Sequence, residues 1–95
     1  MKIELTGKTA LVTGSTRGIG RAIAETLAAC GAKVAVVGRD QARAAEVASG
    51  IAGSKGFGCD VAAPADIAKL IEDIERDLGP LDILVNNAGI TRDNL

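Results

Sequence analysis

Several residue types are absent or scarce in this chain of 95 residues, which has no histidine, tyrosine or tryptophan and one aromatic residue, Phe57. Without histidine, and with only Cys30 and Cys59 as thiols, the chain has too few ligands for a structural zinc site. Two cysteines are also too few for a disulfide framework. We therefore expect no metal site, and we expect both cysteines to behave as small buried apolar residues.

The chain also has no large excess of positive or negative charge and no long hydrophobic segment. The net charge is −1 at pH 7 and no lysine or arginine cluster occurs, which argues against a nucleic acid or an anionic membrane surface as the partner. No apolar run reaches the ~18 residues of a membrane span, and the first residues lack the regions of a signal peptide. We expect a cytoplasmic protein that binds neither nucleic acid nor membrane.

Hydrophobic residues make up 47% of the chain, and they must build the core from Ala, Val, Ile and Leu. Short apolar runs alternate along the chain with segments in which apolar residues recur every three or four positions. Strands are expected at residues 8–14, 33–38, 55–60 and 81–86, and helices at residues 18–30, 41–52 and 64–78. On the polar side of the last helix, two ion pairs are expected, Lys69 with Asp73 and Glu72 with Arg76.

Strictly alternating strands and helices with short connections predict an α/β fold with a parallel sheet. The glycines after the first strand suggest a Rossmann-type three-layer sandwich with the strand order 3-2-1-4 and helices on both faces. The first two helices would cover one face and the third only part of the other, so the sandwich is incomplete. On the first helix, Ile19, Ile23 and Leu27 form the expected apolar stripe.

The stretch from Thr9 to Gly20 carries the functional prediction. An apolar strand leads into Gly14, Gly18 and Gly20, and an Ala-rich helix follows. The start of such a helix offers unpaired N–H groups and the positive end of the helix dipole, which suit a phosphate group. A Cβ at Gly14 or Gly18 would keep a pyrophosphate from the backbone, and one at Gly20 would hold helix and strand apart. The pattern predicts a dinucleotide site.

Two arginines bear on the kind of dinucleotide. Arg39 follows the second strand, at the position where this type of domain meets the adenosine ribose, and Arg17 lies in the glycine turn. An acidic residue at position 39 would bind a ribose 2′-hydroxyl, whereas a guanidinium favours a 2′-phosphate. We therefore favour NADP(H) over NAD(H). Alternatively, both arginines are solvated surface residues and Asp40 neutralises Arg39.

Polar residues also end the third and fourth strands. Asp60 and Val61 lie near the expected position of an adenine, and Asp60 either accepts a hydrogen bond from its amino group or caps the following helix. Asn86 and Asn87 end a buried strand, where polar side chains need partners in neighbouring loops or in a ligand. The Ala88–Gly89 pair leaves backbone room for a nicotinamide ribose.

Taken together, these motifs resemble the short-chain dehydrogenase/reductase family: Thr13-Gly14-x-x-x-Gly18-Ile19-Gly20, then Asp60-Val61, then Asn86-Asn87-Ala88-Gly89. The run from Asn86 to Leu95 and the start from Thr6 to Gly14 look most like the 3-oxoacyl-[acyl-carrier-protein] reductases of fatty-acid biosynthesis. The resemblance implies reduction of a carrier-bound 3-oxoacyl group with NADP(H) by a dimer or tetramer, and it implies that Asn86 braces the central strand. The expected cofactor-binding residues are Gly14, Ser15, Thr16, Arg17, Gly18, Ile19, Gly20, Arg39, Asp60, Val61, Asn87, Ala88 and Gly89.

The chain departs from the family in what it lacks. Family members act through a serine and a Tyr-x-x-x-Lys pair further along the chain, together with an asparagine after the fourth strand. The present sequence holds no tyrosine. We expect no catalytic residue in it, and we expect residues 1–95 to be the N-terminal part of a single NAD(P)-binding domain, inactive alone, of an NADP-dependent oxidoreductase.

Two alternatives stay open. The chain is a catalytically inactive half-Rossmann fragment that only binds nucleotide, or it comes from a relative with another substrate, such as an acetoacetyl thioester, a sugar or a steroid. An isolated chain of this length would leave the strand at residues 81–86 with an open apolar edge. We expect such a chain to be marginally stable and to associate.

Overall fold

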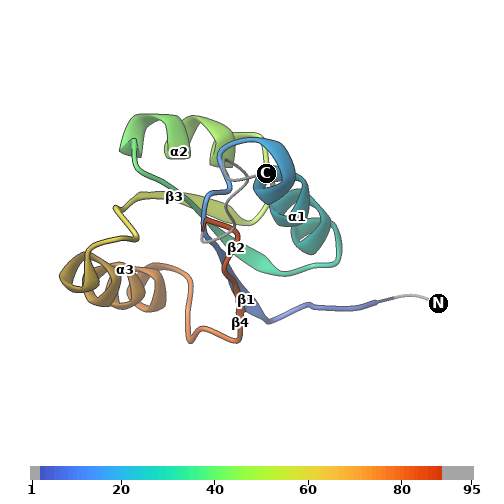
Figure 1. The fold of residues 1–95 in the computed structure, drawn as a ribbon. Coiled ribbons are helices and arrows are strands. Elements are labelled where there is room, and N and C mark those ends of the chain that lie inside the picture. The colour runs from blue at the N-terminus through green and yellow to red at the C-terminus, as the bar shows by residue number, and fades with distance from the viewer. Residues whose placement is uncertain (1–2, 89–95) are drawn as a thin grey trace.

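The computed structural model describes residues 3–88, which form a four-stranded parallel sheet and three helices (Figure 1). The elements are β1 (Thr9–Val12), α1 (Gly18–Ala29), β2 (Lys33–Gly38), α2 (Gln41–Ser49), β3 (Ser54–Gly58), α3 (Pro64–Asp77) and β4 (Ile83–Val85). All strand pairs are parallel, and the spatial order is β3-β2-β1-β4. The predicted Rossmann-type α/β fold and its strand order are confirmed.

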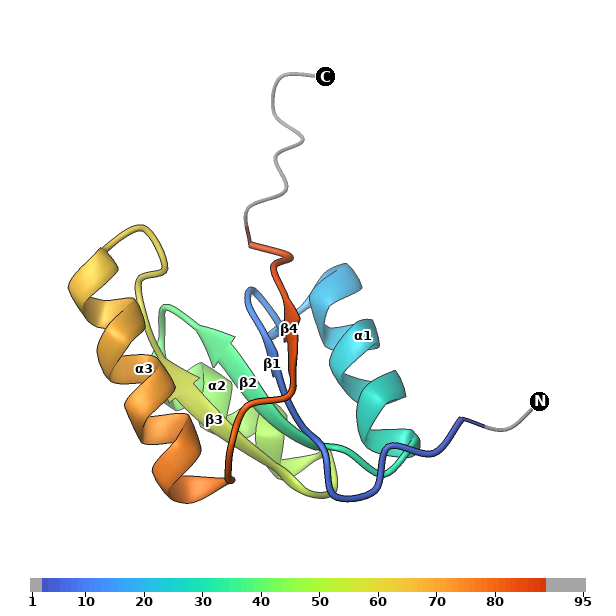
Figure 2. The same ribbon diagram turned by 90° about the horizontal axis from the view of Figure 1, so that it is seen from below.

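Helices lie on both faces of the sheet (Figure 2). Buried residues of α1 and α2 form one core cluster with the alternate strand positions Ala10, Val12, Val34 and Val36. The intervening strand positions point to the other face, where they pack with α3 in a second cluster that includes Leu11, Val37, Phe57, Leu70 and Ile74. None of the helices in the described part of the chain has the length and apolar character that a membrane span requires.

The predicted apolar stripe of α1 is wrong at Ile19, which is 66% exposed, while Ile23 and Leu27 pack against the core as expected. The buried residues of the helix are small, Gly20 and Ala24. A Cβ on Gly20 would collide with the carbonyl group of Gly14, so the glycine lets the helix lie directly against the end of β1. Ile23 and Leu27 are partly buried beside this contact.

Several elements are shorter than predicted, and backbone turns or side-chain hydrogen bonds at their ends account for the difference. β1 ends at Val12 rather than at residue 14 because Gly14 adopts a left-handed conformation with φ +62°. α2 ends at Ser49 rather than at residue 52, and the left-handed Gly53 then turns the chain into β3. β4 begins at Ile83 rather than at residue 81, because the carboxylate of Asp82 accepts the N–H of Thr9 at 2.9 Å in place of a strand carbonyl.

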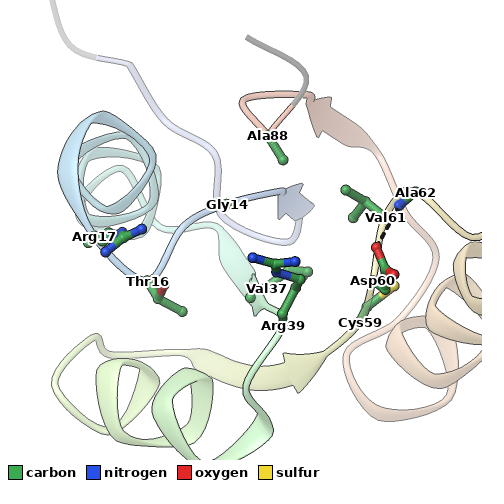
Figure 3. A pocket seen from close by; sticks show the side chains of 11 residues that line it. Gly14, Thr16, Arg17, Val37, Arg39, Cys59, Asp60, Val61, Ala62 and Ala88 are labelled. Carbon is green, nitrogen blue, oxygen red and sulfur yellow. Dashed lines mark hydrogen bonds between the residues drawn. The ribbon is translucent and has the colours of Figure 1, made fainter. Parts of the chain in front are cut away.

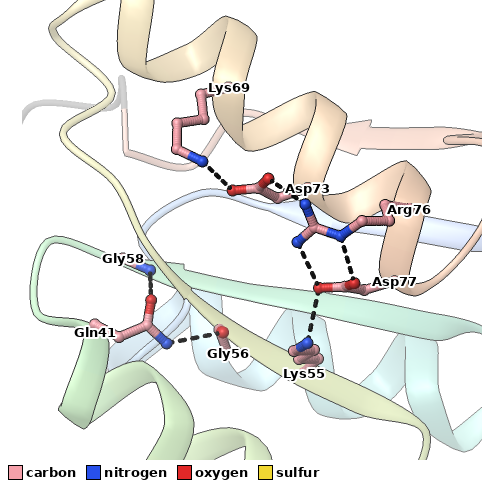
Figure 4. A network of polar contacts seen from close by, with 8 residues as sticks. All are labelled: Gln41, Lys55, Gly56, Gly58, Lys69, Asp73, Arg76 and Asp77. Carbon is pink, nitrogen blue, oxygen red and sulfur yellow. Dashed lines mark hydrogen bonds and ion pairs between the residues drawn. The ribbon is translucent and has the colours of Figure 1, made fainter.

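The edge strand β3 is covered by α2 rather than by another strand. A Cβ on Gly56 would collide with the backbone of Ala44, so this glycine lets α2 lie on the strand. The side chain of Gln41 donates to the carbonyl of Gly56 at 3.1 Å and accepts from the N–H of Gly58 at 2.7 Å (Figure 4). The carboxamide thus occupies two backbone groups of β3 that point away from β2, as a further strand would.

The side of α3 that borders β3 carries a chain of ion pairs (Figure 4). The predicted pair of Lys69 with Asp73 is present at 3.2 Å. The predicted pair of Arg76 with Glu72 is wrong, because Arg76 binds Asp73 and Asp77 instead, each at 3.0 Å. The guanidinium can hold both carboxylates at once because it presents several donors in a fork.

Candidate nucleotide-binding cleft

A cleft of about 420 Å³ opens at the carboxyl edge of the sheet (Figure 3). Its lining comes from the turn after β1, the ends of β2 and β3, and the segment after β4. The predicted site residues that line it are Gly14, Thr16, Arg17, Arg39, Asp60, Val61 and Ala88. Residues that are far apart in the sequence therefore meet at the edge where open α/β sheets bind their ligands.

The turn between β1 and α1 depends on glycine at two positions. Gly14 and Gly18 have φ angles of +62° and +61°, a conformation that other residues adopt only with strain. A Cβ on Gly14 would also lie 3.3 Å from Ala88, whereas one on Gly18 would meet nothing within 4 Å. Packing and backbone conformation both require glycine at position 14, while conformation alone requires it at position 18.

Ser15, which was predicted to contact the cofactor, has a structural role in the turn after β1. The residue is fully buried, and its hydroxyl group donates to the carbonyl of Val12 at 2.7 Å and accepts from the N–H of Val37 at 2.8 Å. Its own N–H donates to the carbonyl of Val37 at 2.9 Å. Ser15 thus fastens the turn to β2, and its polar groups are engaged in the protein.

The N-terminus of α1 borders the cleft without a side-chain cap. Its N-cap residue, Arg17, makes no capping hydrogen bond, and the first turn holds no acidic residue. By contrast, Asp40 caps α2 and accepts from the N–H groups of Ala42 and Arg43. Gly18, Ile19 and Gly20 do not line the cleft, but they form the first turn of α1, whose N–H groups have no acceptor within the helix.

The cleft has a basic and an acidic side. Arg17 and Arg39 are exposed and line it, and neither forms an ion pair within residues 3–88. Both arginines are exposed, as the alternative held, but no ion pair joins Asp40 to Arg39 within residues 3–88, and Asp40 caps α2 instead. Asp60 projects into the cleft from the end of β3 (Figure 3).

Asp60 does not cap α3, so that alternative is wrong. The N-cap of α3 is Ala63, which makes no side-chain capping bond. Asp60 instead accepts the N–H of Ala62 on its carboxylate and the N–H of Ala63 on its carbonyl, both at 3.0 Å. These bonds fix the loop in which Asp60 and the half-buried Val61 line the cleft.

The segment after β4 is fastened to the turn after β1. The hydroxyl of Thr13 lies 3.2 Å from Oδ1 of Asn86 and accepts the N–H of Ala88 at 2.9 Å. The side chain of Asn87 donates to the carbonyl of Gly14 at 3.2 Å. Asn87 braces the turn and is not among the residues that line the cleft, and its contact with the cofactor stays a prediction. The predicted contact Gly89 lies outside the described residues.

Four lining residues were not among the predicted contacts: Val37, Gly38, Cys59 and Ala62. A signal existed for Gly38, because a glycine ends the apolar strand just before Arg39, and a Cβ there would lie 2.6 Å from the methyl group of Thr16. No sequence signal marks Cys59, whose thiol is buried in the floor of the cleft. Burial raises its pKa, and the negative charges of Asp66 and Asp60 add to the effect.

Within residues 3–88, no group of three or more His, Cys, Asp or Glu side chains is placed to hold a metal ion. The cleft combines the glycine turn after β1 with the uncapped start of α1, at the carboxyl edge of the parallel sheet. That combination defines a dinucleotide-binding fold. The family model described as short chain dehydrogenase matches residues 8–95, and the chain belongs to this family.

The chain is also similar to individual members of the family, all described as 3-oxoacyl-[acyl-carrier-protein] reductase FabG. It is 54% identical to the protein of Escherichia coli and 55% identical to that of Haemophilus influenzae, covering 94% of this chain and 37% of each relative. The identity to the protein of Aquifex aeolicus is 51%, over all of this chain and 40% of the relative. The chain thus spans about two-fifths of the length of these curated relatives.

Proposed function

We propose that this chain binds NADP(H) and forms the cofactor-binding part of an enzyme that reduces 3-oxoacyl-[acyl-carrier-protein] to the 3-hydroxyacyl form in fatty-acid biosynthesis. The observation that carries the proposal is the uncapped start of α1 beside a cleft that also receives Arg17 and Arg39. The identity of 51–55% to the three reductases supports the substrate.

The chemistry of the cleft fits this cofactor. The N–H groups of the first turn of α1 would bind the diphosphate, and the absence of an acidic cap leaves them available to an anion. Arg39 and Arg17 would bind a 2′-phosphate by charge-assisted hydrogen bonds. Asp60 would accept from the adenine amino group, and Ala88 would border the nicotinamide ribose. When bound, the cofactor supplies the hydride for the reduction.

The proposal places the protonation step outside these residues. Reduction of a ketone needs an acid that donates a proton to the carbonyl oxygen as the hydride arrives. The chain has no tyrosine or histidine to do so, so we propose that these 95 residues bind the cofactor but are inactive alone. Assembly of the complete protein as a dimer or tetramer in the cytoplasm, suggested by the family resemblance, belongs to the same proposal.

Cofactor titration tests the site. We expect NADPH to bind at least about 10-fold more tightly than NADH, as monitored by nicotinamide fluorescence, because a hydrogen bond between charged groups contributes about 1.5–3 kcal/mol. Arg39→Ala should reduce the preference for NADPH, and Arg17 should retain the remainder. Arg21→Ala is a control with the same loss of charge, since Arg21 pairs with Glu25 on the outer side of α1. Equal affinities in the unaltered protein would contradict the role of Arg39, and no binding would contradict the site.

A second experiment tests the reaction. The 95-residue chain should not oxidise NADPH in the presence of a 3-oxoacyl thioester, and turnover would contradict its proposed inactivity. For the protein that contains these residues together with its catalytic part, we expect the carrier-bound 3-oxoacyl group to be reduced with the highest kcat/KM. A preference for an acetoacetyl thioester, a sugar or a steroid would instead support the alternative substrates.

A further inference from the structure

Arg43 connects α2 to the turn after β1. One of its guanidinium nitrogens donates to the carbonyl of Thr16 at 3.4 Å, and another binds the carboxylate of Glu46 at 3.2 Å. The contact with Thr16 joins residues 27 positions apart. Arg43 is exposed and does not line the cleft, so any effect on a ligand there would be indirect.

Contacts of Thr16 restrain the position of the turn between β1 and α1. Ser15 before it is fixed to β2 by hydrogen bonds, and Arg17 after it is the N-cap of α1. The methyl group of Thr16 packs over Gly38, where a Cβ would lie 2.6 Å away. Packing therefore restrains the side chain of Thr16, while Arg43 restrains its carbonyl group.

We infer that Arg43 is a positioning residue for cofactor binding: by holding the carbonyl of Thr16, it fixes the turn that presents Arg17 and the first N–H groups of α1 to the cleft. This inference rests on the proposed function. A guanidinium suits the role because its rigid fork binds the Thr16 carbonyl and the Glu46 carboxylate together, with Glu46 keeping it in place. The bond is exposed and long, so its effect should be moderate.

The role predicts a pattern that differs from that of Arg39. Arg43→Ala should weaken NADPH and NADH binding by the same factor, about 3- to 10-fold for the loss of one hydrogen bond, because both cofactors use the same turn. Arg39→Ala should weaken NADPH binding alone. Arg21→Ala removes the same charge from an ion pair away from Thr16 and should change neither affinity. Arg43→Lys keeps the charge and an N–H donor group but not the rigid fork, and it should fall between Arg43→Ala and the unaltered protein.

Hydrogen exchange in the protein without cofactor gives a readout that does not need binding. Arg43→Ala should speed exchange of the backbone amides in residues 15–18 and leave those of β2 unchanged. Unchanged exchange in Arg43→Ala would overturn the inference, and so would unchanged affinities for both cofactors. Loss of NADPH affinity alone would also overturn it, because Arg43 would then be a direct phosphate ligand. If the unaltered protein binds neither cofactor, the proposed function fails, while unchanged exchange in Arg43→Ala would separately refute the positioning role.

Discussion

Single glycines in the turn after β1 serve different purposes. Gly14 and Gly18 are needed for their left-handed backbone, whereas Gly20 is helical and needed for space. A Cβ on Gly20 would strike the carbonyl of Gly14 and lie 2.7 Å from Nδ2 of Asn87. Gly20 therefore controls how closely α1 approaches the strand ends that border the cleft.

Gly20→Ala should destabilise the protein by about 1–3 kcal/mol, the usual cost of overpacking. The measurement is the free energy of unfolding from urea denaturation, and cofactor affinity should fall in parallel. Gly50→Ala is the matched control, because Gly50 has φ −96° and the nearest atom to an added Cβ is 3.7 Å away. A loss of stability in Gly50→Ala as large as in Gly20→Ala would show that the close approach of α1 is not the cause.

Cys59 should react slowly with an alkylating reagent at neutral pH and faster as the pH rises. The thiol is buried, and its raised pKa keeps it protonated. NADPH should slow the reaction further because Cys59 lies in the lining of the cleft. Mass spectrometry of each cysteine checks this, with the more exposed Cys30 as the internal control. Equal rates for Cys59 with and without NADPH would argue against binding in this cleft.

At the scale of elements, α1 and α2 start in opposite ways. α2 is capped by Asp40, so its first N–H groups are satisfied within the protein, whereas α1 has no side-chain cap and borders the cleft. The cap stabilises the start of α2, whereas the N–H groups at the start of α1 stay available for the diphosphate under the proposed function.

Asp40→Ala should lower the free energy of unfolding by about 1 kcal/mol, because the two N–H groups that bind Asp40 lose their acceptor. Asp40→Asn keeps an acceptor oxygen and should recover most of the loss. Thermal unfolding of both variants measures how much stability each of them loses. If the asparagine variant is as unstable as the alanine variant, the charge of Asp40 and not its capping bond stabilises the protein.

The contact between α3 and β3 should weaken in acid. Arg76 and Lys55 bind Asp77 and lower its pKa from 3.8 to about 2. Because the folded value lies below the unfolded one, Asp77 stabilises the protein fully above about pH 4, and its contribution is lost as the pH falls towards 2. Asp77→Asn should therefore lower the Tm near neutral pH and lower it less at pH 2. Glu72→Gln, outside the ion pairs of the described residues, is the control, and a constant effect of Asp77→Asn across this range would contradict the assignment.

The sequence was sufficient for the sheet order and for most residues of the cleft, because buried runs, glycine spacing and short connections leave few topologies open. It was not sufficient for the start of α1, where Ile19 is exposed and the small Gly20 is buried instead. Which of these two neighbouring residues faces the sheet depends on how closely the backbones of α1 and the turn approach. The roles of Ser15 and Asn87 depend on partners on other strands, so local sequence could not distinguish a brace from a ligand contact.

For the molecule as a whole, the two faces of the sheet are covered unequally. The face with α1 and α2 is well covered, whereas β4 is an edge strand on which Leu84 is 64% exposed. An apolar hollow of about 270 Å³ lies between β4 and α3 and includes Leu84, Ile71 and Leu81 in its lining. In the described residues, exposed apolar surface lies beside the open edge of β4, and such a surface favours contact with another polypeptide.

Self-association through this region is the expected outcome for the isolated chain. Sedimentation should show species larger than the 9.6 kDa monomer, and Leu84→Lys should shift them towards the monomer without loss of helical circular dichroism, because a charged edge residue opposes pairing. Ile3→Lys, at an exposed isoleucine before β1, is the control. A stable monomer that unfolds cooperatively would contradict the expectation.

The carboxamide of Gln41 restricts which edge of the sheet can pair with another chain in such an assembly. Since it mimics a peptide group of a fifth strand alongside β3, an incoming chain would have to displace it before it could bond there. Open-ended polymerisation through both edges of the sheet is therefore disfavoured, and the sheet can be extended more easily at its β4 edge.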